Sequence, residues 1–162
     1  INSICPNVPA SLKWPNDLMA NDRKMGGILL EADGPHAILG CGINIRNAPK
    51  ILDSLVSSTD IAEYQSVLPD AKQLADCYLL NLENLYQIWQ ECGPAPLLAR
   101  WQDKSNIIGR NLTVQLCDRS ITGICDALEP DGRLNIIDID GNVHLITVGD
   151  VVLMGEVNAT NN

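Results

Sequence analysis

Apolar positions along the chain follow two different periods, and this divides the sequence into three predicted regions. Residues 1–50 hold short apolar runs separated by turn residues, which predicts strands. Over residues 70–92 apolar side chains recur every three or four positions, as on one face of a helix of about six turns. From residue 107 onward the runs are short and alternating again. This order predicts an α+β fold, in which a mixed segment precedes a small β module.

The first region predicts an antiparallel hairpin. A short extended run at 11–14 ends at the turn sequence Pro15-Asn16-Asp17. After a polar loop at 21–24, two longer apolar runs at 26–31 and 37–45 flank the tight turn Asp33-Gly34-Pro35. Two such runs around a turn are typical of a hairpin, which we expect to be buried on at least one face.

The helical region has clear start and stop signals. Asp70 is a candidate N-cap, and Gly93-Pro94 should end the helix. A shorter second helix is expected from Ala95 to about Lys104. We expect the aromatic stripe of the long helix to lie in the core (Tyr78, Tyr86, Trp89).

The last region predicts five short strands, at 112–117, 120–127, 134–139, 143–147 and 151–154. Strands at this spacing are typical of a small all-β barrel or sandwich. We therefore expect an α+β unit over 1–106, a β module over 107–157 and a frayed polar tail over 158–162.

Composition narrows the class of partner and compartment. The 162 residues carry a net charge of −9, which argues against nucleic acid or an anionic membrane surface as the main partner. Nothing approaches the run of about 18 apolar residues that spans a bilayer. The start of the chain has no Met and no signal-peptide pattern, and it is typical of a cut through a longer protein. The six cysteines form no C-x-x-C pair, so we expect free thiols in a reducing cytoplasm.

Lys13 and the turn after it are the first candidate for chemistry. A lysine at a strand end, beside a proline-fixed turn with two Asx side chains, suits an anionic group such as a phosphate or carboxylate. The alternative is a solvated lysine beside an ordinary turn, and the residues alone favour it because such turns are common.

The glycines of the two longer runs are the second candidate. Gly26-Gly27 and Gly40-Cys41-Gly42 lie in predicted strands, where glycine marks close approach of a ligand or of another backbone. They could form the floor of a flat pocket with Asn44 at its rim, or they could mark bulges and crowded strands. Lys24 is a second candidate cation or a solubilising loop residue. Neither glycine run matches a dinucleotide or P-loop motif.

Taken together, the motifs L-K-W-P-N-D-L, K-M-G-G-I-L-L-E and G-C-G-I-N-I resemble the central motifs of the biotin–protein ligases. The segment from Ala95 to Trp101, Ile108-Gly109-Arg110 and the D-G-R-L and G-D-V strings of the β module resemble the rest of that family's C-terminal part. The resemblance runs from about residue 11 to 154. It implies part of a class II aminoacyl-tRNA-synthetase-like catalytic domain, followed by an SH3-like β-barrel.

The resemblance also implies a reaction and roles. The family activates biotin with ATP and Mg²⁺ to biotinyl-5′-adenylate, and then transfers biotin to a lysine of a carboxylase's biotin carboxyl carrier domain. Lys13 matches the lysine beside the biotin carboxylate and α-phosphate. Asn16 and Asp17 match residues that shape this corner, where Asp17 either orients Lys13 or binds Mg²⁺. The residues that match the pocket floor are Gly26, Gly27, Ile28 and Gly42. Asn44 matches a residue that contacts the adenine, and Lys24 matches a lysine on the phosphate side.

The chain departs from the family pattern in one respect. The family's Gly/Arg-rich loop and the strands that grip the biotin ring precede the K-W-P-N-D motif, and this segment holds neither. We therefore expect residues 1–162 alone not to make biotinyl-adenylate at a useful rate. A lipoate-type ligase or octanoyl transferase, and a non-enzymatic interaction role for the β module, are the alternatives. A homodimer is left open, and no DNA-binding helix-turn-helix is evident.

Overall fold

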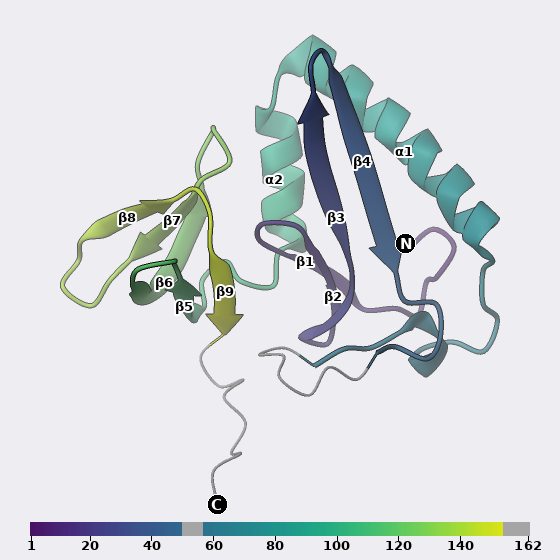
Figure 1. Ribbon diagram of the computed structural model, residues 1–162, viewed down its shortest axis with the longest axis horizontal. Helices are drawn as coiled ribbons and strands as arrows, with labels where there is room; N and C mark the ends of the chain where they lie inside the picture. Colours follow the sequence, from purple (N-terminus) through teal and green to yellow (C-terminus); the bar gives the residue numbers. More distant parts are fainter. Residues whose placement is uncertain (50–56, 154–162) are drawn as a thin grey trace, which may run out of the picture.

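The structure is a computed structural model that describes residues 1–49 and 57–153. A four-stranded antiparallel sheet comes first, with its strands side by side in chain order: β1 (Ala10–Lys13), β2 (Asp17–Ala20), β3 (Arg23–Asp33) and β4 (His36–Ile43). A short 3-10 turn (Ile61–Glu63) and two helices follow, α1 (Ala71–Cys92) and α2 (Ala95–Lys104). Figure 1 shows both helices beside this sheet and a separate β module on the other side of α2.

The strand β2 was not predicted, because it begins inside the turn sequence. Asp17 opens the strand, and Ala20 closes it after only four residues. The predicted polar loop shrinks to a tight turn, since Asn21 and Asp22 both adopt positive φ (48° and 58°). Two residues in this left-handed region match the twist of a hairpin, and Asn and Asp tolerate it better than most side chains. Residues 10–33 are therefore three strands where the pattern predicted two.

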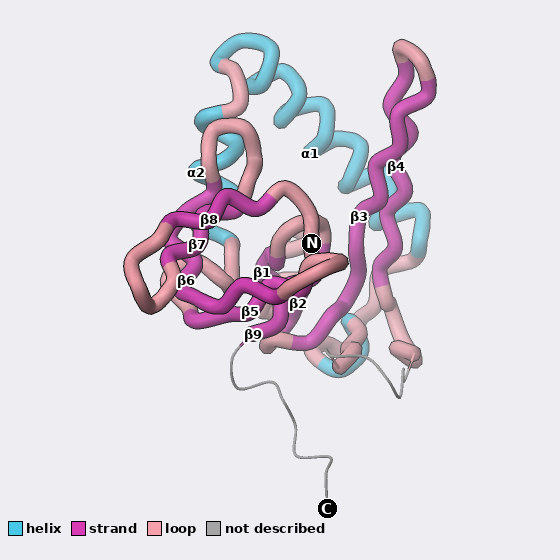
Figure 2. The backbone as a smooth tube through the Cα atoms, turned by 60° about the vertical axis from the view of Figure 1, so that its left-hand side comes forward, coloured by secondary structure: helices cyan, strands magenta, loops and turns pink. Residues whose placement is uncertain are grey.

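The predicted β3–β4 hairpin is confirmed, but its predicted burial is wrong. The strands pair from Gly26 with Ile43 to Asp33 with His36. Leu29 and Leu30 are nevertheless 59% and 63% exposed. Figure 2 shows the hairpin extending well beyond β1 and β2. Its outer apolar side chains therefore remain in contact with solvent.

Helix α1 begins and ends as predicted, but its aromatic stripe does not reach a core. The Asp70 side chain accepts from the Gln73 backbone N–H at 2.7 Å, and the Gln73 side chain accepts from the Asp70 N–H, which forms a capping box. Tyr86 and Trp89 are about half exposed and stack edge to face 5.6 Å apart. Leu74 is the buried residue of this helix, so α1 is anchored at its N-terminal end. Neither described α-helix is long and apolar enough to cross a membrane.

The β module confirms the five predicted strands. They are β5 (Asn111–Gln115), β6 (Ser120–Leu128), β7 (Leu134–Ile137), β8 (Val143–Ile146) and β9 (Asp150–Leu153), in the spatial order β8-β7-β6-β5-β9. Alternating residues of β6 point into a core that includes Ile121 and Cys125. Burial raises the pKa of Cys125 to about 12, so this thiol stays protonated. The expected tail at 158–162 and the predicted strand end at residue 154 lie outside the described residues.

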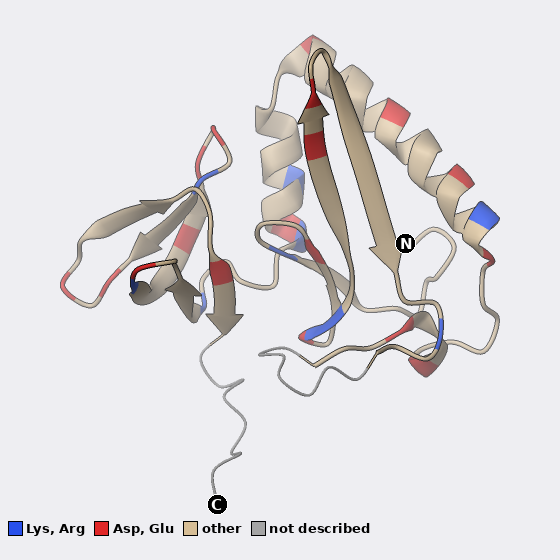
Figure 3. Ribbon diagram, in the orientation of Figure 1, with Lys and Arg blue, Asp and Glu red and all other residues tan. Residues whose placement is uncertain are grey.

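The acidic residues and the cysteines can also be located in the structure. Figure 3 shows acidic residues on β3, on α1 and on the strands and loops of the β module, in keeping with the net charge of −9. All six cysteines are free thiols. Three of them, Cys41, Cys92 and Cys117, are exposed, which fits a protein whose cysteines are not used as structural cross-links.

A hydrogen-bonded carboxylate in the turn between β7 and β8 makes the stability of the β module depend on pH. His144 Nε2 lies 2.7 Å from Asp138 Oδ2, and Asn142 donates to Asp138 from its backbone and side chain. The ring of His144, and then the Asn142 donors, hold the pKa of the Asp138 carboxyl well below its usual range. The folded protein therefore binds this proton less readily than the unfolded chain.

We predict that this stabilisation is complete above about pH 4, the ordinary aspartate range, and is lost as the pH falls below it. Asp138→Asn should lower the free energy of unfolding at neutral pH and flatten its decline between about pH 5 and 2. Urea unfolding at a series of pH values measures this. Asp140→Asn in the same turn is the control, and an equal effect of both variants would contradict the prediction.

Candidate functional site

The register of the first sheet aligns one lysine, one carboxylate and two glycines in a single row. Lys13 pairs with Asp17, Asp17 with Gly27, and Gly27 with Gly42. Residues directly opposite one another on neighbouring strands share a face of the sheet. The row therefore has a charged half on β1 and β2 and a half without side chains on β3 and β4.

The corner after Lys13 is fixed to the neighbouring strand by Asn16. Its side-chain Nδ2 donates to the Ile28 carbonyl at 2.7 Å, and its own carbonyl accepts from the Ile28 N–H at 2.9 Å. Next in the chain, the carboxylate of Asp17 forms an ion pair with Lys24 and is only 14% exposed. These contacts explain why the K-W-P-N-D and K-M-G-G-I-L segments belong together. The second motif supplies the strand and the cation that hold the first in place.

The sequence left open whether these glycines form a pocket floor or allow strands to crowd together, and the structure shows both cases. A Cβ on Gly26 would lie 2.3 Å from the Gly42 carbonyl oxygen, so this glycine allows close approach of another backbone. A Cβ on Gly27 would make ordinary contacts, 3.5 Å from Asp17 Oδ1. A Cβ on Gly42 would meet nothing within 4 Å. Gly42 thus leaves open space above the sheet and Gly27 borders the Asp17 corner with room for a methyl group, whereas Gly26 is needed within the sheet.

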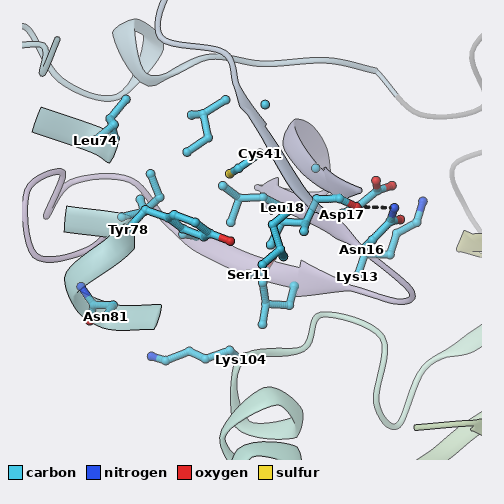
Figure 4. A pocket seen from close by; sticks show the side chains of 18 of the residues that line it. Ser11, Lys13, Asn16, Asp17, Leu18, Cys41, Leu74, Tyr78, Asn81 and Lys104 are labelled. Carbon is cyan, nitrogen blue, oxygen red and sulfur yellow. Dashed lines mark hydrogen bonds between the residues drawn. The ribbon is translucent and has the colours of Figure 1, made fainter. Parts of the chain in front are cut away.

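A cavity of about 960 Å³ lies over this row, bounded by the sheet on one side and by α1 and α2 on the other. Figure 4 shows Lys13, Asn16 and Asp17 at one end of it, with Leu74 and Tyr78 at the other. Its walls are mostly apolar side chains of β2, β3, β4 and α1 (Leu18, Ile28, Leu29, Leu39, Ile43, Leu74).

The electrostatic character of the cavity differs between its ends. Partial burial raises the pKa of the Tyr78 hydroxyl, and the nearby Cys41 thiol adds to the effect. Burial likewise raises the pKa of the Cys41 thiol. Both groups are therefore neutral at physiological pH, so this end offers weak polar contacts without charge. The opposite end carries Lys13, whose residue is only 5% exposed, and the Asp17 carboxylate.

Six of the predicted site residues line the cavity, and three do not. The six are Lys13, Asn16, Asp17, Gly27, Ile28 and Gly42. Gly26 lies within the sheet, and Lys24 reaches the site through its ion pair with Asp17. Asn44 donates from Nδ2 to the Thr59 carbonyl at 3.0 Å, which ties the end of β4 to the segment that follows the undescribed residues.

The helices contribute cavity residues that sequence reasoning missed. Tyr78 and Asn81 of α1, and Trp101 and Lys104 of α2, all line the cavity. Helical periodicity marks which side chains share a face, but it does not say which other element that face meets. No motif in these helices singled out these positions.

A family model, curated relatives and solved structures all relate this chain to biotin or biotin/lipoate protein ligases. Residues 3–44 match the model of the biotin/lipoate A/B protein ligase family. The biotin–[acetyl-CoA-carboxylase] ligase of Mycobacterium tuberculosis is 32% identical over 148 residues, which cover 91% of this chain and 54% of the relative. The bifunctional ligase/repressor BirA of Escherichia coli is 30% identical, over 88% of this chain and 46% of that protein.

The fold is also shared with solved structures. The apo biotin protein ligase of Aquifex aeolicus superimposes with a TM-score of 0.82 over 94% of this chain and 69% of that one, at 22% identity. The same enzyme in complex with biotin and ATP gives 0.79 at 24% identity, over 94% of this chain and 65% of that one.

The fold is thus that of the biotin protein ligases, and the motif-bearing sheet lies in the part that matches the biotin/lipoate A/B protein ligase family. Among known proteins, the chain is similar to the C-terminal part of biotin protein ligases along most of its length. It spans about half the length of the curated relatives that it matches.

Because Gly26 and Gly42 have different surroundings, we predict that replacing each by alanine changes the free energy of unfolding by different amounts. Gly26→Ala should lower the free energy of unfolding by about 1–3 kcal/mol, because the new methyl group collides with a backbone carbonyl. Gly42→Ala should change it by less than about 0.5 kcal/mol, because its methyl group enters open space. Chemical denaturation of both variants measures the difference. Equal destabilisation would contradict the assignment of Gly42 to an open pocket floor.

Proposed function

We propose that the protein to which this chain belongs activates biotin with ATP to biotinyl-5′-adenylate and transfers biotin to a lysine of a carboxylase's carrier domain. The observation that carries the proposal is the row in which Lys13 and Asp17 adjoin the side-chain-free positions Gly27 and Gly42. The match to the biotin/lipoate A/B protein ligase family and the Aquifex aeolicus enzyme's complex with biotin and ATP support it.

Lys13 is the proposed catalytic residue of the activation step. A biotin carboxylate oxygen attacks the α-phosphorus of ATP, a new P–O bond forms, and the bond to pyrophosphate breaks. Two anions must approach one another for this to happen. An ammonium group beside both neutralises their repulsion and stabilises the charge that develops on phosphorus. Because Lys13 is only 5% exposed, water screens it little, and its charge acts more strongly than that of a surface lysine.

In the transfer step the ε-amine of the acceptor lysine attacks the acyl carbon of the adenylate. The C–O bond to the phosphate breaks, AMP leaves with the bonding electrons, and the amine gives up a proton. Lys13 then faces the same phosphate as leaving group. We assign Asn16 and Asp17 to holding this corner, through the bonds of Asn16 to Ile28 and the ion pair of Asp17 with Lys24.

The remaining cavity suits an apolar ligand with a polar ring. We propose that Gly27, Ile28 and Gly42 form its floor, while Gly26 keeps β3 and β4 close beneath it. The volume of about 960 Å³ is at the upper end of the range for small-molecule sites. The neutral end at Tyr78 and Cys41 fits an uncharged ring better than a second anion.

Magnesium would enter this reaction with the nucleotide. The Asp17 carboxylate is ion-paired with Lys24, and residues 1–49 and 57–153 hold no cluster of three acidic, histidine or cysteine side chains that could cage a metal. Mg²⁺ usually binds through one or two carboxylates together with substrate phosphates, and it neutralises phosphate charge when bound. We assign Asp17 to orienting the corner, where it is held by its ion pair with Lys24.

We assign residues 1–106 to the catalytic domain and the β module from residue 107 to an SH3-like C-terminal domain. Asn44 is proposed as an adenine contact through groups other than the Nδ2 that bonds Thr59. Lys24 is proposed on the phosphate side. The free thiols favour a reducing cytoplasm.

A lipoate-type substrate is the competing function, because the family model covers biotin and lipoate ligases alike. Thermal shift of the protein from the complete reading frame separates the two. Biotin with ATP should raise its Tm, whereas lipoate with ATP at the same concentrations should not. The reverse result would assign the protein to lipoate.

The role of Lys13 predicts a specific loss of activity. Lys13→Ala in the protein from the complete reading frame should reduce biotin-dependent pyrophosphate release by about 10²–10³-fold, because a charge aimed at the transition state is removed. Lys72→Ala, on the exposed surface of α1, should leave the rate unchanged. Unaltered activity of Lys13→Ala, with circular dichroism showing a folded protein, would refute the mechanism.

A further inference from the structure

Consecutive residues of the corner face opposite parts of the molecule. Lys13 lines the cavity, whereas Trp14 is 5% exposed and belongs to the hydrophobic core of the β module. Its neighbours in that core include Ile107, Leu112 and Leu153. The residue after the candidate catalytic lysine is thus buried in a different domain-like unit, more than ninety positions away in the sequence.

A hydrogen bond fixes the tryptophan within the module. Trp14 Nε1–H donates to the Gly132 carbonyl at 3.1 Å, in the turn between β6 and β7. Further hydrogen bonds close that turn, since Arg133 donates to Asp131 from its backbone N–H and from Nε at 3.2 and 2.7 Å. Gly132 has a φ of +85°, which glycine adopts without strain. Its carbonyl is therefore held in place to receive the indole.

A second contact holds the other end of β2. The carboxylate of Asp22, in the turn after that strand, accepts from Arg110 Nη1 at 3.1 Å to each oxygen. It also accepts from Asn106 Nδ2 at 2.9 Å, while the Asn106 backbone N–H donates to the Leu12 carbonyl at 3.0 Å. Asn106 directly precedes the module and Arg110 lies at its start, so the turns at both ends of β2 are attached to it.

We propose that Trp14 and Asp22 are positioning residues through which the β module fixes the placement of Lys13 and Asp17 over the pocket floor. This rests on the function proposed above. Strand β2 is only four residues long, and the turns at its two ends are each bonded to the module or its entry segment. Sliding or tilting of β1 and β2 would move the charged half of the row against the glycine half. A misplacement of about 1 Å at a reacting group can cost about 10²-fold in rate.

The first experiment uses residues 1–162 and needs no catalytic activity. An amine-acylating reagent is applied, and modification of Lys13 is measured by mass spectrometry relative to the exposed Lys72. Trp14→Phe removes only the indole donor, and Asp22→Asn removes the charge that Arg110 binds. Each should raise the relative labelling of Lys13 about fivefold, the local opening that loss of one ordinary hydrogen bond allows.

Matched substitutions at exposed sites are the controls. Trp89→Phe and Glu83→Gln, both at exposed positions of α1, should leave the labelling of Lys13 relative to Lys72 unchanged. Urea unfolding of every variant gives the globally unfolded fraction. If Lys13 labelling in Trp14→Phe and Asp22→Asn rises no more than that fraction explains, the two residues are merely structural and the proposal is overturned.

The second experiment uses the protein from the complete reading frame, with biotin and ATP. Trp14→Phe should lower kcat for pyrophosphate release about tenfold and change KM for biotin by less than about threefold, because misplacement of Lys13 acts on the transition state. A raised KM with unchanged kcat would overturn the proposal. If the unsubstituted protein itself shows no biotin-dependent reaction, the proposed function fails, while the labelling of Lys13 still decides whether the β module positions it.

Discussion

The alignment of Lys13, Asp17, Gly27 and Gly42 across four strands is the constraint on which the candidate site depends. Because facing residues of neighbouring strands share one side of a sheet, this register brings a cation and a carboxylate next to two positions without side chains. A slip of one residue would turn Lys13 to the opposite face and place a side chain where the floor is bare. The site thus depends more on how the four strands pair than on any single residue.

Several contacts that lie outside the pocket serve this register. The close approach of Gly26 to the Gly42 carbonyl keeps β3 and β4 in place, and Asn16 ties the corner to Ile28. Trp14 and Asp22 join the same short strands to the β module. The charged groups are consequently held by backbone and by buried or hydrogen-bonded side chains. Such preorganisation suits a reaction in which two anions must meet, since the stabilising charge need not move into place.

The uncovered apolar surface of the β3–β4 hairpin and of α1 sets this chain apart from an ordinary compact domain. Leu29, Leu30 and Trp89 are each at least half exposed, although their spacing is that of core residues. Amphipathic patterning specifies that a face is to be buried and says nothing about the layer that buries it. For this reason the helix and the hairpin were predicted correctly, while the burial of Tyr86, Trp89 and the hairpin was not.

The sequence by itself determined the period of each segment, the cap at Asp70 and the five strands of the β module. It also determined the motifs that resemble those of the biotin protein ligases, because all of these are local signals. Only the tertiary structure decided that Asp17 begins a strand, that Gly26 serves the sheet while Gly42 faces open space, and that Tyr78 and Lys104 line the same cavity as Lys13. It also placed Trp14 in the core of the β module. These features depend on contacts between residues far apart in the chain, which neither periodicity nor spacing encodes.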